Sequence, residues 1–397
     1  MTMMEAYLDY NATTPVDPQV FEAMRPFLSG EFGNASSIHK KGQSARHAVE
    51  VARETIADFL EVEPGDIVFT SGGTEADNLA VKGTMEALGE KRKHLVVSAI
   101  EHQAVLHPAQ FLQGRGFTLT IVPVNKNGII DLDFLKKSMN DETALVSVMH
   151  VNNEIGTIQP LKEIGEIAHR NGALFHVDAA QSFGKLEIHP EELGIDMFSM
   201  SGHKICGPKG TGALYIRKGL KVKAMTHGGH QEKNIRPGTE NVAAVAGFGR
   251  AVELAASLRE KEAERVLMLR NKLQEGLKES IPDIHVNGDP VRRIYNTLNV
   301  SFPGLDGETL LMNLDLKNIY VSTGSACTAG SIEPSHVLIA LGMPDPLARA
   351  AIRLSLGRFT TKEEIDYALK EIPPLVKRLG KASTQNKGKI PEHTKLP

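Results

Sequence analysis

The feature that most constrains this chain is an alternation of short apolar, β-branched runs with amphipathic segments between residues 67 and 216. Between the runs, apolar residues recur at helical spacing, as Leu161, Ile164 and Ile167 do. Such an alternation predicts an α/β fold with a mainly parallel sheet flanked by helices. The expected strands cover residues 67–69, 95–97, 119–124, 144–149, 173–177, 197–198 and 212–216.

The sequence beyond this region predicts a second, smaller unit. From residue 242 to about 280 there is no proline and apolar residues keep a helical period, which indicates a long helix leading out of the α/β region. Two further strands are expected at 297–302 and 319–322. A terminal helix is expected at 362–379, broken by its Pro-Pro pair at 373–374.

These elements predict a division into domains. We expect a large α/β domain over 16–255 and a small α+β domain formed by 1–15 and 256–379, with a mobile loop at about 323–333. Residues 380–397 offer little apolar surface to bury and predict a disordered tail.

Composition narrows the class of protein and of partner. The 397 residues are 41% hydrophobic and 23% charged, close to ordinary globular chains, and the net charge of −3 comes with no long basic or acidic block. Nothing therefore favours a nucleic-acid or membrane-surface partner, and no apolar run approaches the roughly 18 residues of a membrane span. Two cysteines exclude a disulfide framework, and together with an N-terminus unlike a secretory signal they predict a cytoplasmic protein.

A glycine pair after the first apolar run forms a candidate anion site. Gly72, Gly73 and Thr74 precede a helical stretch, so consecutive backbone amides would be exposed at a helix N-terminus, where the dipole favours an anion such as phosphate. The alternative is that Thr74 only caps the helix, with Asp77 three residues on.

An acidic residue, Asp178, follows the apolar run 173–177. A buried carboxylate is costly unless a cation pairs with it, and the protonated pyridine nitrogen of pyridoxal 5′-phosphate (PLP) is such a cation. The simpler alternative for Asp178 is a helix cap.

A lysine, Lys204, ends the sequence Ser201-Gly202-His203-Lys204 after another expected strand. Enclosure can destabilise the charged form of a lysine, and the neutral amine can then form a Schiff base. Taken alone, Lys204 would be interpreted as a surface lysine. The order of phosphate loop, strand-end acid and lysine turn along one domain favours a PLP site instead.

Six motifs in a fixed order extend this pattern over nearly the whole chain except its tail. They are YLDYNATTP at 7–15, EH at 101–102, HVNNEIG at 150–156, SGHK at 201–204, RPGTEN at 236–241 and RLSLGR at 353–358. With them the chain resembles the class V aminotransferase family of PLP enzymes and, within it, the cysteine desulfurases that serve nitrogen fixation and iron–sulfur cluster assembly. The resemblance implies the PLP-dependent transferase fold of type I.

The resemblance also implies roles for individual residues. Lys204 would hold PLP as a Schiff base, Asp178 would pair with the pyridine nitrogen, and His102 would stack on the ring and assist proton transfer. As a lone histidine, His102 would otherwise be a satisfied core residue. The other cofactor contacts would come from Gly73, Thr74, Ser201 and His203 at the phosphate, from Gln181 and Asn153 on the phenolic side, and from Thr239 of a partner subunit, which implies a homodimer.

Substrate binding is assigned to Arg353, Asn153 and Asn34 in the same way. Arg353 would clamp the α-carboxylate of the substrate, a task that suits a planar bidentate donor. The alternatives are an interdomain ion pair for Arg353 and a turn-forming role for Asn153.

Cys327 lies in a run of small residues that cannot pack firmly, and a mobile thiol suits a nucleophile that carries sulfur outward. Cys327 could also ligate a transient iron–sulfur cluster together with a scaffold partner, and no intrinsic metal site is expected. Cys206, where the family more often has a bulky residue, is assigned a packing role.

The reaction that the resemblance implies converts L-cysteine to L-alanine and leaves sulfur on Cys327 as a persulfide, for an iron–sulfur scaffold or another acceptor protein. The alternatives are a selenocysteine lyase or an aminotransferase of the same fold. A non-enzymatic scaffold is disfavoured by the presence of both Lys204 and Cys327.

Overall fold

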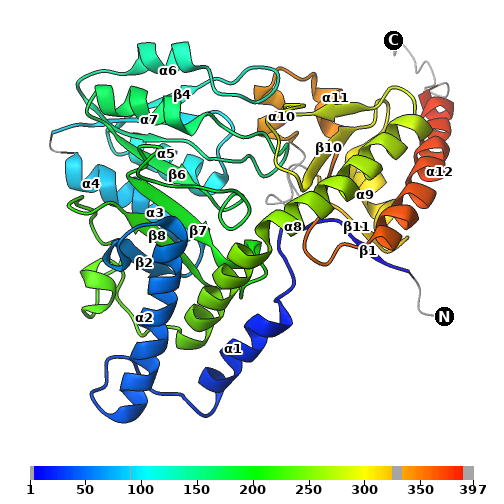
Figure 1. Ribbon diagram of the computed structural model, residues 1–397. Helices are drawn as coiled ribbons and strands as arrows, with labels where there is room; N and C mark the ends of the chain where they lie inside the picture. The colour runs from blue at the N-terminus through cyan, green and yellow to red at the C-terminus, as the bar shows by residue number, and fades with distance from the viewer. Residues whose placement is uncertain (1–3, 90, 324–332, 388–397) are drawn as a thin grey trace, which may run out of the picture.

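A computed structural model describes residues 4–89, 91–323 and 333–387, with side chains up to residue 381 (Figure 1). Its centre is a seven-stranded sheet in the order β2-β8-β7-β6-β5-β3-β4. β8 is antiparallel to both of its neighbours, and the remaining pairs are parallel, which confirms the predicted mainly parallel sheet. The strands are β2 (Ile67–Thr70), β3 (His94–Ser98), β4 (Thr118–Val122), β5 (Thr143–Ser147), β6 (Leu174–Asp178), β7 (Met197–Ser201) and β8 (Gly212–Ile216).

Both faces of this sheet are covered by helices. Apart from the edge strand β4 and the first residue of β6, every residue of these strands is buried, as their continuous apolar runs require. Successive residues point to opposite faces, so Val96 and Val146 belong to one core while Leu95 and Leu145 belong to the other. The first core packs under α2 (Lys40–Leu60), α6 (Leu132–Ser138) and α7 (Leu161–Arg170), and the second under α3 (Gly73–Asn78), the π-helical turn η2 (Leu79–Gly83), α4 (Thr84–Leu88) and α5 (Gln103–Gln113).

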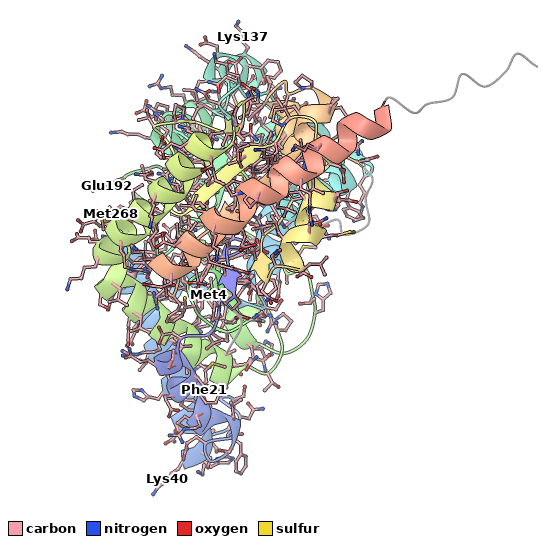
Figure 2. All side chains as sticks on the ribbon, turned by 90° about the vertical axis from the view of Figure 1, so that its right-hand side faces the viewer. Met4, Phe21, Lys40, Lys137, Glu192 and Met268 are labelled. Carbon is pink, nitrogen blue, oxygen red and sulfur yellow. The ribbon has the colours of Figure 1, made fainter. Side chains whose placement is uncertain are left out.

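The long helix α8 (Val242–Ser280) has the limits predicted for it. Its N-cap is Asn241, whose side chain accepts a hydrogen bond from the Ala244 amide at 3.3 Å. Its first half places Phe248 in the core of the large sheet, and its second half places Leu273 in a separate core. Figure 2 shows the second half lying beside α12 (Lys362–Lys387) along one face of the molecule.

The separate core belongs to two small sheets and the helices around them. A three-stranded antiparallel sheet has the order β12-β10-β9, and β1 pairs with β11 in parallel. The strands and helices of this region are β1 (Ala6–Tyr7), β9 (His285–Asn287), β10 (Thr297–Ser301), α9 (Gly307–Asp315), β11 (Ile319–Tyr320), α10 (His336–Ala340), α11 (Asp345–Arg349) and β12 (Ala351–Ser355). The domain boundaries expected from the sequence stay a prediction.

The remaining elements are short, apart from α1. These remaining elements are α1 (Pro18–Leu28) and the 3-10 turns η1 (Pro64–Asp66), η3 (Gly202–Lys204) and η4 (Gln231–Asn234). Among the described residues, no helix is both long enough and apolar enough to cross a membrane.

Two expectations about the C-terminal region were wrong. The terminal helix is not broken by Pro373 and Pro374, because α12 continues through both prolines to Lys387. Ile372 and Leu375 on either side of the pair are buried in the second core, and this packing outweighs the lost backbone hydrogen bonds. Residues 380–387 are therefore helical rather than a disordered tail, and 388–397 lie outside the described residues.

Candidate active site

Most of the sequence-predicted site residues converge on one cavity of about 290 Å³. It lies at the carboxyl ends of β6 and β7, where side chains leaving adjacent strands meet. Asn11, Asp77, Met149 and Val151 also contribute to its wall. The predicted residues that line it are Gly73, Thr74, His102, Asn153, Asp178, Gln181, Ser201, His203, Lys204 and Arg353.

One end of the cavity is built to receive an anion. α3 begins after Gly72, which has a φ of 151° and makes no side-chain cap, so Thr74 is not the helix cap that the alternative required. A Cβ added to Gly73 would lie 3.5 Å from the Ser201 Cβ, which shows how closely the start of α3 approaches the end of β7. This end of the cavity thus holds the backbone amides of the first turn of α3, the hydroxyls of Thr74 and Ser201 and the imidazole of His203.

His203 is neutral at this end. Its Nδ1 lies 3.1 Å from the Thr13 Oγ1. Burial, together with the nearby charge of Lys204, lowers the pKa of His203 to about 4. His203 can therefore serve as a hydrogen-bond partner for an anion but not as a fixed positive charge.

Asp178 lies at the end of β6 and is buried. Its Oδ1 accepts a hydrogen bond from the Ala180 amide at 2.9 Å, a local turn contact rather than a helix cap. Burial raises the pKa of Asp178, while the charges of His102 and Lys204 act in the opposite direction. A cation placed in the cavity would stabilise this carboxylate.

Lys204 is held by the N-terminal segment. It ends η3, and its Nζ donates hydrogen bonds to the carbonyl oxygens of Asn11 and Ala12, the latter at 2.8 Å. Thr14 fixes the same turn, since its amide and its hydroxyl both donate to the His203 carbonyl. The amine is thereby directed into the cavity rather than to the surface.

His102 caps α5 with its own side chain. Its Nδ1 accepts a hydrogen bond from the Ala104 amide at 3.1 Å, which leaves Nε2 as the ring nitrogen that carries or exchanges a proton. Burial lowers the pKa of His102. The residue is both a structural cap and part of the cavity wall.

Arg353 comes from β12 and joins the small sheet to the cavity. Its Nη2 lies 2.7 Å from the Asp9 Oδ1 and its Nη1 donates to the Asn153 carbonyl at 3.1 Å. Its Nε is buried and has no hydrogen-bond partner among the described residues. Arg353 therefore forms an ion pair, but with a residue of the same expected small domain rather than across domains, and its guanidinium also lines the cavity.

Three predicted residues are not placed in this cavity. Asn34 and Thr239 are exposed, and neither is among the residues that line it. Cys327 lies outside the described residues. Cys206, by contrast, is buried at 3% exposure, in agreement with a packing role, and its φ of 64° is unusual for a residue with a side chain.

The donor set of the cavity fits PLP. Amides and hydroxyls at one end suit the phosphate, Asp178 suits the pyridine nitrogen, Gln181 suits the phenolic oxygen, and the Lys204 amine suits the aldehyde carbon. In the described part of the chain, no group of three or more His, Cys, Asp or Glu side chains could hold a metal ion.

The sequence also matches a family model described as Aminotransferase class-V over residues 6–368. The chain belongs to the class V aminotransferase family. It is 48% identical over 375 residues to the cysteine desulfurase IscS of Dictyoglomus turgidum, a match that covers 94% of this chain and 95% of that protein. It is 50% identical to the cysteine desulfurase IscS of Methanosarcina thermophila, covering 94% and 92%.

Solved structures show the same likeness. A structure titled NifS-like protein superposes with a TM-score of 0.89 at 40% identity, covering 95% of this chain and all of that one. A structure titled SspA in complex with cysteine superposes with a TM-score of 0.79 at 37% identity, covering 90% and 100%. The likeness to these solved structures thus covers nearly the whole chain rather than one of its two cores.

Sequence reasoning missed two buried carboxyl groups, one that lines the cavity and one that is buried outside its lining. Asp77 lines the cavity beside Asp178, and burial together with the charge of Asp178 raises its pKa. Glu101 is fully buried, accepts hydrogen bonds from Ser98 and from the Met149 amide, and has a pKa raised by burial to about 8. The EH motif at 101–102 was the only signal for Glu101.

Proposed function

We propose that this chain is a PLP-dependent cysteine desulfurase that converts L-cysteine to L-alanine and transfers the sulfur atom to Cys327. The observation that carries the proposal is one cavity lined by an amine, Lys204, a strand-end acid, Asp178, and a guanidinium, Arg353. Its relatives named cysteine desulfurase, at 48% and 50% identity over nearly their full length, support the same activity.

Each residue has a task that follows from its position. Arg353 binds the α-carboxylate of the substrate, since its Nε is buried without an acceptor among the described residues. Bound PLP supplies an electron sink, and Asp178 keeps its pyridine nitrogen protonated. Lys204 moves the proton of the substrate Cα, and the His102 Nε2, whose ring also lines the cavity, assists proton transfer.

Sulfur transfer is assigned to Cys327. Its thiolate attacks the substrate sulfur, a new S–S bond forms, and the C–S bond breaks with its electron pair left on the substrate carbon, which takes up a proton to give alanine. The persulfide then passes to an acceptor protein such as an iron–sulfur scaffold. We place this reaction in the cytoplasm, because two cysteines without a disulfide framework suit a reducing compartment.

The enzyme is proposed to act as a homodimer. α1 and its connection to α2 expose four large apolar side chains, which is an unusual amount of apolar surface for a free chain. These side chains, 51–92% exposed, are Phe21, Leu28, Phe32 and Ile38. Figure 2 shows Phe21 and Lys40 at the end of the molecule where this segment projects. The exposed positions of Asn34 and Thr239 suit contacts with the cavity of a partner subunit.

The experiment that tests the function uses the two cysteines. After incubation with L-cysteine, mass spectrometry of digested protein should find one added sulfur atom on the peptide that contains Cys327. The Cys327→Ser protein should bind PLP and release no persulfide sulfur, whereas Cys206→Ala should keep most activity. Added sulfur on Cys206, or sustained sulfur transfer by Cys327→Ser, would falsify the assignment.

A further inference from the structure

The side-chain amide of Gln181 is held at both of its ends. Its Nε2 donates a hydrogen bond to the Asn11 carbonyl at 3.0 Å, and its Oε1 accepts one from the Lys185 Nζ at 3.3 Å. Lys185 follows Gln181 by four residues and has no place in the mechanism described above.

These two contacts permit only one orientation of the amide. An ammonium group can only donate hydrogen bonds and a carbonyl oxygen can only accept them. A flipped amide would set its NH₂ group against the Lys185 ammonium and its oxygen against the Asn11 oxygen. Because Nε2 carries two hydrogens and Asn11 accepts one, the second hydrogen remains for an acceptor inside the cavity that Gln181 lines.

Lys185 approaches Gln181 from a second, smaller cavity. This space of about 20 Å³ is lined by Lys185, Lys204, Cys206, Glu262 and Arg358, among others, so that Lys204 borders both cavities. Burial lowers the pKa of Lys185 to about 8, while the charge of Glu262 supports its protonated form and that of Arg353 opposes it. The ammonium is thus predominantly present at neutral pH, where it can donate to Gln181.

We propose that Lys185 is a positioning residue of the PLP site, which fixes the Gln181 amide so that an N–H is directed at the phenolic oxygen of the cofactor. The inference rests on the proposed PLP site, but it concerns neither the substrate nor Cys327. Lys185 acts through Gln181 and forms no covalent bond to the cofactor.

The test is a pH titration of the visible absorption band of the PLP-loaded full-length protein. The band reports protonation next to the phenolic oxygen, and a donor to that oxygen stabilises its anionic form. Lys185→Met should therefore move the titration midpoint to higher pH by about 0.5–1 unit, the effect of one hydrogen bond of ordinary strength. Lys185→Arg, which keeps the donor, should restore most of the midpoint.

Lys209→Met is the matched control. Lys209 is exposed, and its charge, like that of Lys185, lowers the pKa of His203, so that both lysines act electrostatically on the same site. An equal shift in Lys209→Met would show that charge alone matters and would overturn the proposal. So would an unchanged midpoint in Lys185→Met.

A double-mutant cycle separates positioning from a direct effect. In a Gln181→Met background, Lys185→Met should cause no further shift, because the residue through which it acts is gone. A full additional shift would overturn the proposal. Protein that binds PLP but transfers no sulfur leaves this test intact and contradicts only the proposed reaction, whereas a chain that develops no visible band with PLP contradicts the PLP site itself.

Discussion

Lys204 lies in a turn that is also held by contacts other than those of its own side chain. The turn is held through the His203 carbonyl by Thr14, so a truncated side chain at position 204 leaves its supports in place. Two other lysines, Lys185 and Lys209, lie close enough for their charges to act on His203. The proposed covalent link between Lys204 and PLP can therefore be tested in a folded variant, with Lys185 and Lys209 as the alternative attachment sites.

Lys204→Ala should abolish alanine formation and remove the reducible covalent link to PLP. Borohydride reduction of the PLP-loaded wild-type protein followed by peptide mapping should place the cofactor on Lys204. A label on Lys185 or Lys209 in the wild-type protein would contradict the assignment, and an unchanged melting temperature for Lys204→Ala would serve as the control for folding.

Asp178→Asn should keep the fold and reduce turnover strongly. The amide can still accept from the Ala180 amide, but it has no negative charge with which to keep a pyridine nitrogen protonated, which is the role proposed for Asp178. We expect a loss in kcat of at least about a hundredfold, which corresponds to roughly 3 kcal/mol in the barrier. A change of less than about threefold would reduce Asp178 to a turn-forming residue.

Glu101 makes the stability of the protein depend on pH. An ordinary Glu has a pKa of about 4.3, whereas burial raises that of Glu101 to about 8, so the folded state binds the proton more tightly than the unfolded state. The free energy of unfolding should therefore fall as the pH rises between these two values.

Glu101→Gln should remove this dependence, because its carbonyl oxygen can keep accepting from Ser98 and Met149 while the side chain stays neutral. Urea unfolding at pH 5.5 and pH 8 should show a smaller difference for the variant than for wild type. Parallel pH profiles for the two proteins would mean that Glu101 does not titrate in this range.

At the residue scale, the sequence suffices for side chains that belong to local motifs and fails for those defined by packing. Lys204, Asp178 and the Gly72–Gly73 turn stand in recognisable order along the chain. Asp77 and Lys185 acquire their environment only when other strands and the N-terminal segment close around them. No local pattern carries that information.

At the scale of elements, apolar periodicity predicted the strands of the large sheet and the limits of α8, because strands buried on both faces read as continuous apolar runs. The prediction for α12 failed for another reason. The rule that proline breaks a helix did not hold there, because tertiary contacts keep the helix continuous. Ile372, Leu375 and Val376 are buried on the second core and keep the helix continuous.

Pro374→Ala should therefore stabilise the protein. Pro374 is exposed within α12, lacks a backbone donor and crowds the carbonyl four residues before it. Alanine removes a helix penalty of about 1–3 kcal/mol and so raises the free energy of unfolding. The greater freedom of the unfolded chain offsets about 0.4–1 kcal/mol of this gain. Chemical denaturation of both proteins measures the difference, and a destabilised variant would show that the proline conformation is needed at this position.

At the scale of the whole molecule, Asn34 and Thr239 lie outside the cavity of their own chain. A homodimer with shared sites predicts complementation between inactive variants. A Thr239→Ala chain retains Lys204, and a Lys204→Ala chain retains Thr239, so a heterodimer restores one of its two sites. Mixed and refolded variants should regain activity that neither has alone, and a monomer in sedimentation would rule out a shared site.

α8 belongs to both cores at once, with Phe248 in one and Leu273 in the other. At 1.5 Å per residue, its 39 residues extend about 58 Å without a break. If either core melts, the half of the helix that it supported loses its packing, and the fraying propagates along the same backbone toward the other core. Heat should accordingly be absorbed in a single calorimetric peak, with no plateau of a half-melted species, although the chain is large enough for two independent transitions.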